Sequence, residues 1–174
     1  MSLSRITKTI LLIFIVSMMG CSTDTDIPSE QIEEFNASVK SKVKFNFTTS
    51  LKGGNEVPAN DSKAAGEAII KISKDETYLE YKLIVANIDD VRMAHFHMAP
   101  AGTNGGIVTW LFGLADPPID VNGILAEGVI TEDDLTGALE GASFKDLLDA
   151  IRAGNIYVNV HTIDFPGGEI RGQL

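Results

Sequence analysis

From residue 41 onward, apolar side chains recur at every second position of the chain. Val43, Phe45 and Phe47 alternate with polar residues, and residues 79–86 repeat the pattern. Alternation with a period of two is typical of half-buried β-strands. A polar turn at residues 73–76 is expected to join the second and third strands as a hairpin. The same pattern predicts further strands at residues 68–72, 93–98, 107–111, 124–130, 156–161 and 169–174.

One segment has the period of a helix instead. Ser143 is the predicted N-cap, Asp146 stands at the capping-box position, and Gly154 ends the helix. The apolar stripe between them is formed by Phe144, Leu147, Leu148 and Ile151. Residues 131–135 are expected to form another turn of helix. Seven or eight short strands with one short helix predict an all-β fold, an antiparallel β-sandwich or barrel with Greek-key-like connections.

The first twenty residues differ from the rest of the chain. Arg5 and Lys8 precede an apolar run at residues 10–19, which is typical of a signal peptide and too short to span a bilayer. The next residues, Gly20 and Cys21, complete a segment that resembles a bacterial lipobox, in which the cysteine carries the lipid after cleavage. We therefore expect residues 1–20 to be a lipoprotein signal peptide. A plain secretory signal with an incidental cysteine is the alternative, and both interpretations predict export.

Composition and charge limit the domain organisation, the partners and the kinds of metal site that the chain can have. Residues 21–40 are polar and acidic, as expected of a flexible tether behind the lipidated Cys21. The whole chain has 174 residues and a formal charge of −10, so one globular domain is expected and nucleic acid is a poor partner. With a single cysteine there is no internal disulfide, and the core or a metal must hold the domain together. A blue-copper site is excluded because it needs a thiolate inside the fold.

Two of the three histidines, His95 and His97, are one residue apart on a predicted strand. Because side chains alternate between the faces of a strand, both point to the side of Met93, whereas Ala94 and Phe96 point to the apolar side. Positions two residues apart are separated by about 6.6 Å along a strand. Two imidazoles that lean together from these positions can both contact one ion at about 2.0–2.1 Å. The pair therefore has the geometry of a metal clamp.

The third histidine, His161, falls on the polar face of the predicted strand 156–161, together with Asn159. If this strand lies near the one with His95 and His97, the three imidazoles converge as a three-histidine site for copper or zinc. Metal binding needs neutral imidazoles, so we expect it to weaken below about pH 6.5. The alternative is that these are surface histidines, which hydrogen-bond to Asn159 or to a loop carbonyl and bind no metal.

Three groups of residues resemble motifs of a known family. They are GNEVP at residues 54–58, AHFH at residues 94–97 followed by PAG at 100–102, and YVNVHT at 157–162 followed by PGGEIRGQL at 166–174. Together they resemble the CHRD domain, named for chordin, over about residues 43–174. A local departure is Ala99, where the family often has glycine.

The resemblance implies an extracellular all-β domain, immunoglobulin-like or superoxide-dismutase-like, with no established catalytic activity. The His-x-His strand also looks like the copper-binding strand of Cu,Zn superoxide dismutases, with His161 as the single distant histidine. The sequence has no fourth histidine and no recognisable zinc loop, so dismutation is not expected.

A few other side chains are candidates for a role near the histidines. Asn159, Glu169 and Arg171 are expected to support the imidazoles by hydrogen bonding. For Glu169 and Arg171 the alternative is an exposed ion pair worth at most about 1 kcal/mol. Trp110 and Phe112 are expected to fill the core, as aromatic residues of a small sandwich usually do, and the alternative is that they form a platform for a ligand.

Two hypotheses for function follow. The sequence lacks a nucleophile elbow and an acid-base constellation, so no catalytic residue is predicted and enzyme activity is not expected. The first hypothesis is a lipid-anchored protein of the bacterial cell envelope, on the outer membrane or cell surface. Its CHRD domain, residues 41–174, would be a non-enzymatic binding module for a protein or another envelope ligand. The alternative is an envelope protein that holds copper or zinc for storage, resistance or redox work at His95, His97 and His161.

Overall fold

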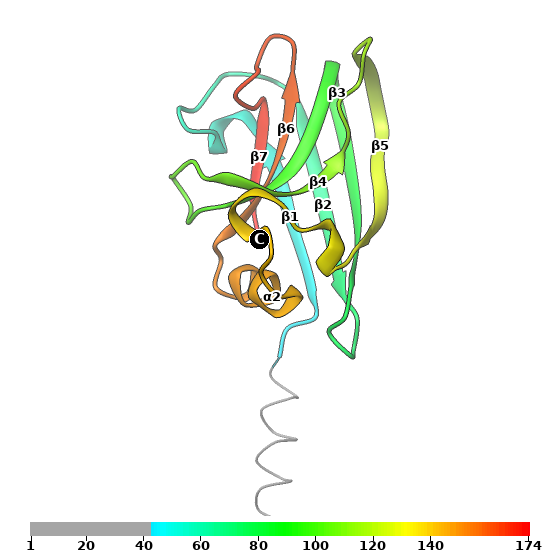
Figure 1. Cartoon of the computed structure of the whole chain (residues 1–174). Helices are drawn as coiled ribbons and strands as arrows, with labels where there is room; N and C mark the ends of the chain where they lie inside the picture. Colours follow the sequence, from blue (N-terminus) through cyan, green and yellow to red (C-terminus); the bar gives the residue numbers. More distant parts are fainter. Residues whose placement is uncertain (1–42) are drawn as a thin grey trace, which may run out of the picture. The chain divides into compact units, whose positions relative to one another are not determined.

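The structure is a computed structural model that describes residues 43–174. The expected signal peptide, Cys21 and the tether lie outside the described residues. The described part is built of antiparallel strands and one α-helix, which confirms the all-β prediction (Figure 1). Within it, no helix has the length and apolar character needed to cross a membrane.

The strands form one antiparallel system that closes on itself. Its order is β2-β1-β7-β6-β3-β4, and β2 pairs again with β3, while β5 pairs with the other edge of β3. The result is a barrel-like sandwich with α2 at one end of the strands (Figure 1). The elements are β1 Asn46–Lys52, β2 Ala65–Ile72, β3 Leu79–Met98, β4 Gly106–Phe112, β5 Ile119–Ile130, α2 Phe144–Arg152, β6 Ile156–Thr162 and β7 Ile170–Gln173.

The longest strand, β3, belongs to both halves of the sandwich. Its first half pairs with β2 and β5, and its second half pairs with β6 and β4. The sequence predicted two separate strands here, at residues 79–86 and 93–98. The structure joins them through Asn87 and Asp90, which adopt left-handed backbone conformations with φ of 53° and 49°. Asparagine and aspartate tolerate this region better than most residues, so the chain bends without leaving the sheet.

Most other sequence predictions for the elements are confirmed, with shifted ends. Residues 73–76 form the turn of the β2–β3 hairpin, and Glu132–Asp134 is a short 3-10 helix. In α2 the predicted capping box is present, since the Asp146 carboxylate accepts hydrogen bonds from the Ser143 backbone N–H and hydroxyl. The first strand begins at Asn46 rather than residue 43, and β5 begins at Ile119, earlier than predicted.

The core lies between the sheet faces and under α2. Phe96 and Val160 are fully buried in it, as are Leu147 and Leu148 of the helix. All seven residues of β6 are buried, although its side chains alternate between apolar and polar. The polar face of β6 is therefore covered as well. The sequence pattern had predicted a half-buried strand with its polar face exposed to water.

Trp110 departs from the sequence prediction. It retains 46% of its surface exposed instead of filling the core, whereas Phe112 packs partly buried against the core. The reason is the irregular β3–β4 register, which shifts between Ala94 and His95: Trp110 stands opposite His95 on the polar side of the sheet, whereas Phe112 stands opposite the buried Ala94.

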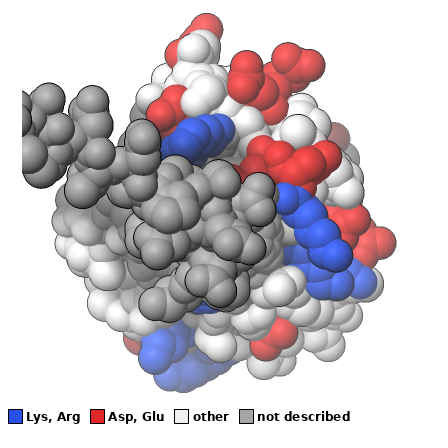
Figure 2. All heavy atoms as spheres, turned by 90° about the horizontal axis from the view of Figure 1, so that it is seen from below, with Lys and Arg blue, Asp and Glu red and all other residues white. Residues whose placement is uncertain are grey.

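The surface carries charges of both signs. In the end-on view of Figure 2, lysine and arginine side chains lie beside aspartate and glutamate side chains on the part of this face that is described. One such pair joins Lys82 to Glu127 at 2.9 Å between β3 and β5. Both side chains are well exposed to water, so the pair contributes at most about 1 kcal/mol to stability.

We predict that Phe96→Ala lowers the free energy of unfolding by about 3–5 kcal/mol, because the ring is fully buried and its removal leaves a cavity. Ile124→Ala is the matched control, since Ile124 lies on β5 with 55% of its surface exposed. Its effect is expected to stay within about 1 kcal/mol. Urea denaturation of the purified chain measures both. Equal losses would contradict the assignment of Phe96 to the core side of β3.

Candidate metal centre

The pairing of β3 with β6 positions all three histidines. His95 stands opposite Asn159 and His97 opposite Tyr157, while His161 stands opposite Met93. Cross-strand partners point to the same face of a sheet, and residues two apart share that face. The register therefore gathers the three imidazoles on the polar face of the sheet, opposite the core.

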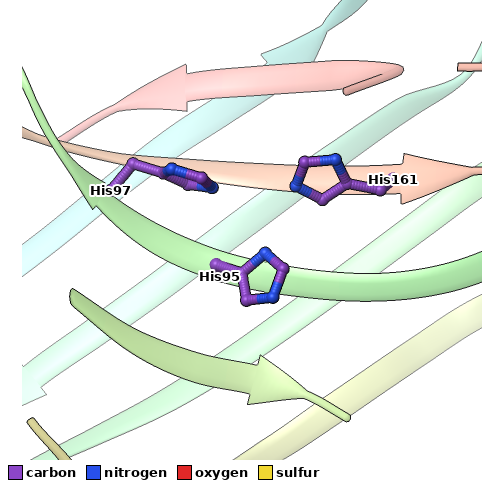
Figure 3. Close-up of side chains that lie close together, drawn as sticks. All are labelled: His95, His97 and His161. Carbon is purple, nitrogen blue, oxygen red and sulfur yellow. The ribbon is translucent and has the colours of Figure 1, made fainter. Parts of the chain in front are cut away.

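The three rings face a common space. Their centroids are 5.4 Å apart for His95 and His97, 5.1 Å for His95 and His161, and 5.8 Å for His97 and His161. One nitrogen from each ring can be chosen so that all three lie within 4.8 Å of one another. Figure 3 shows these nitrogens directed toward the gap between the rings, with the second nitrogen of His95 directed away from it. A shared ion at about 2.0–2.1 Å from each nitrogen requires the rings to draw slightly closer together.

Backbone carbonyls fix the tautomers of two histidines. Nδ1 of His97 lies 3.0 Å from the Gly105 oxygen, and Nδ1 of His161 lies 3.0 Å from the Pro166 oxygen. A carbonyl only accepts hydrogen bonds, so Nδ1 carries the hydrogen in both rings and Nε2 keeps its lone pair. Both Nε2 atoms are buried without a hydrogen-bond partner, as are both nitrogens of His95.

Burial is the main electrostatic feature of the cluster. His95, His97 and His161 retain 0%, 8% and 7% of their surface exposed. Loss of water lowers all three pKa values, and His161 and His97 lower that of His95 further, to about 3. His95 therefore stays neutral in mild acid, and burial favours the neutral form of His97 and His161 as well. The expectation that metal binding weakens below about pH 6.5, which rests on the ordinary histidine pKa, moves to lower pH as a result.

The alternative that these are surface histidines is wrong, because all three side chains are buried. It is right that loop carbonyls accept hydrogen bonds from two of the rings. The loop carbonyls that it foresaw bind Nδ1 of His97 and His161. They leave the opposite nitrogens free. Histidines that bind metals usually donate their second N–H to a carbonyl or carboxylate in this way, because the contact fixes the ring and its tautomer.

An aromatic and cationic stack borders the histidines. The Tyr157 ring lies parallel to the His97 ring, at 8° and 4.9 Å between centroids. The Arg171 guanidinium lies 3.4 Å from the centroid of the same tyrosine ring. Arg171 also donates hydrogen bonds to the Thr103 carbonyl and the Asn104 side chain, which holds the loop after β3 against the sheet.

The predicted exposed ion pair between Glu169 and Arg171 is wrong. Both side chains are buried, at 8% and 2% exposed, and no ion pair joins them within residues 43–174. Glu169 instead accepts hydrogen bonds from Ser62 at 2.6 Å and Thr162 at 2.7 Å. Neither side chain forms a hydrogen bond with a histidine in this part of the chain, and Arg171 reaches the cluster only through the Tyr157 ring that stacks on His97.

Sequence reasoning missed Glu56. It lies just after the 3-10 helix Gly53–Asn55, and both its carboxylate oxygens accept hydrogen bonds from Asn159, at 2.9 and 3.1 Å. Burial raises the pKa of Glu56 to about 7, against the opposing effects of Arg171 and Asn159. Glu56 belongs to the GNEVP motif at residues 54–58, but no periodic pattern places that loop over β6, so only the motif gave a signal.

Gly168, in the turn between β6 and β7, allows the backbone to pass close to the side chains of Asn159 and Glu56. A Cβ at Gly168 would lie 2.4 Å from the Asn159 amide nitrogen and 2.8 Å from a Glu56 oxygen, and its φ is +127°. Only glycine fits such a position without displacing its neighbours. The turn before β7, in which the Gly168 N–H donates to the Phe165 carbonyl at 3.0 Å, thereby closes the polar layer.

Comparison with known proteins gives one positive result. The family model for the CHRD domain matches residues 47–174. No curated protein and no solved structure matches the chain. The match covers all seven strands except the first residue of β1, and it includes Glu56 and the three histidines.

We predict that Glu56 and His95 have opposite effects on stability as the pH falls. In the unfolded chain, His95 binds a proton below its ordinary pKa of 6.5. In the folded chain it binds a proton only at about pH 3, so acidification stabilises the unfolded chain and stability falls. Glu56 takes up its proton at about pH 7 when folded and at about 4.5 when unfolded, so stability rises over that range. Each contribution has a slope of up to about 1.4 kcal/mol per pH unit.

The measurement is urea denaturation of the metal-free chain between pH 4.5 and 6.5. Glu56→Gln should make stability fall more steeply with acidification than in the wild type, and His95→Gln should make it fall less steeply. Three parallel curves would contradict the burial of both groups as titrating side chains.

Proposed function

We propose that this chain, which belongs to the CHRD domain family, binds a copper or zinc ion through His95, His97 and His161. The observation that carries the proposal is the set of four buried imidazole nitrogens without hydrogen-bond partners. A buried polar atom without a partner costs about 1–3 kcal/mol. Several such atoms facing one space are expected where an ion or a water belongs.

The chemistry of the donors fits a transition metal. Nε2 of His97 and of His161 offer lone pairs, because their Nδ1 atoms donate to the Gly105 and Pro166 carbonyls. One nitrogen of His95 supplies the third donor. Three imidazoles suit Zn²⁺ and copper, and they leave a fourth position for water or another ligand. Calcium and magnesium are poor candidates because they prefer oxygen ligands.

The proposed location is the bacterial cell envelope. Residues 1–20 resemble a signal peptide, which supports export. The lipobox-like segment that ends at Cys21 supports a lipid anchor, which would hold the domain on the outer membrane or the cell surface. The acidic tether up to residue 40 supports a domain held away from the lipid. In that setting, metal storage, metal resistance and redox work are the roles that a single-ion site can fill.

The first sequence hypothesis, a non-enzymatic module that binds an envelope partner, stays a prediction. It is compatible with metal binding, because the histidines occupy the covered polar face and leave the outer surface free. Metal binding takes precedence here because a specific set of atoms supports it.

We predict one-to-one binding of Cu²⁺ or Zn²⁺ to the untagged full chain, purified metal-free in detergent, by calorimetric titration at pH 7. His161→Gln should abolish it, whereas Asp133→Asn, which alters only an exposed carboxylate, should not. At an ion concentration of about 100 times the dissociation constant, the wild type should gain about 2.7 kcal/mol of stability. Binding of equal strength to the wild type and to His161→Gln would overturn the proposal.

We also predict that labelled palmitate is incorporated into the chain in a bacterial host, because the lipid of a lipoprotein is attached to the cysteine after the signal. Cys21→Ser should abolish the label, and the neighbouring Ser22→Ala should retain it. Label that persists in Cys21→Ser, or a wild type without label that is still secreted, would favour a plain secretory signal instead.

A further inference from the structure

The histidine cluster offers only uncharged donors. Within residues 43–174, the group of side chains close enough to share an ion consists of three histidines and no carboxylate. The two buried glutamates have hydrogen-bond partners of their own: Glu56 accepts from Asn159, and Glu169 accepts from Ser62 and Thr162. A bound ion would therefore bring its full charge into the site.

The surroundings oppose added positive charge. The three rings are almost fully buried, and Arg171 places a permanent positive charge on the far side of the Tyr157 ring that stacks on His97. A buried site beside a fixed positive charge disfavours a high metal charge, because the ion loses its water there and no anionic ligand offsets the charge.

From this charge balance we infer that the three-histidine site is built for the singly charged ion Cu⁺ in preference to Cu²⁺ or Zn²⁺. The inference rests on the proposed function and specifies its ion. The cost of moving an ion out of water grows with the square of its charge, so a divalent ion has a desolvation cost about four times that of a monovalent one of similar size. Zn²⁺ also keeps a fourth ligand, usually water in an open site, and these rings have little exposed surface.

Trp110 is the residue that keeps the site dry on the β4 side. It stands opposite His95 in the β3–β4 pairing, and the two rings meet edge to face at 4.2 Å and 77°. Trp110 is 46% exposed while His95 is 0% exposed, so the indole is the layer between this histidine and solvent. Trp110 is thus assigned as a residue that determines the preferred charge of the ion.

The experiment measures affinity for each ion separately, using the full chain in detergent. Cu⁺ is titrated without oxygen in competition with bathocuproine disulfonate, and Cu²⁺ and Zn²⁺ are titrated in competition with a chelator of divalent ions. We expect the dissociation constant for Cu⁺ to be at least about tenfold below those for Cu²⁺ and Zn²⁺. Equal or tighter binding of either divalent ion would overturn the inference while leaving metal binding intact. No binding of any ion would overturn the proposed function itself.

The role of Trp110 has its own comparison. Trp110→Ala should reduce the ratio of Cu⁺ to Cu²⁺ affinity by at least about threefold, because water then reaches His95 and lessens the cost of a divalent charge. Tyr78→Ala is the matched control, since Tyr78 is a partly exposed aromatic residue in the β2–β3 hairpin. If Trp110→Ala does not fold, Trp110→Gln replaces it. An unchanged ratio in a folded Trp110 variant would contradict the shielding role.

Discussion

The pairing of the second half of β3 with β6 is the constraint on which both the core and the candidate site depend. Its register sets His95 opposite Asn159 and Phe96 opposite Val158. Since side chains alternate along a strand, the same register sends Phe96 and Val158 into the core and the histidines to the other face. A shift by one residue would exchange the two faces and place imidazoles in the apolar core. The apolar packing of the domain therefore fixes the geometry of its histidine cluster.

Sequence periodicity predicted what depends on local pattern. It located most strands, the helix with its Ser143–Asp146 capping box and the common phase of His95, His97 and His161. It did not predict that β3 is continuous, because the bend at Asn87 and Asp90 interrupts the alternation that marks a strand. Nor did it predict that the polar face of β6 is buried. That burial comes from loops such as the one bearing Glu56, whose position depends on contacts more than 100 residues apart in the chain.

The polar side chains buried near β6 differ in how many of their atoms have hydrogen-bond partners. Arg171 and Glu169 have hydrogen-bond partners in the loops that cover them, which is the usual condition for burying charged groups. The histidines have partners only for the Nδ1 atoms that orient two of the rings. The neighbouring groups show that this fold can satisfy polar atoms in the same layer. Within residues 43–174, four of the seven buried side-chain atoms without hydrogen-bond partners are imidazole nitrogens of this cluster, and their concentration there supports a role in binding.

The position of the cluster bears on which metal-dependent role suits the chain. An ion among these rings would leave only after a covering segment moved, because the histidines have little surface of their own. One covering segment, the loop after β3, is held by Arg171 through the Thr103 carbonyl and the Asn104 side chain, and Arg171 is itself fixed against Tyr157. Opening that loop would break these charge-assisted contacts, each worth more than an ordinary hydrogen bond. Slow release suits storage of an ion, or redox work by an ion that stays in place, better than rapid transfer to a partner. The lipid anchor proposed at Cys21 agrees with that choice, since a resident ion would then be retained at a fixed location.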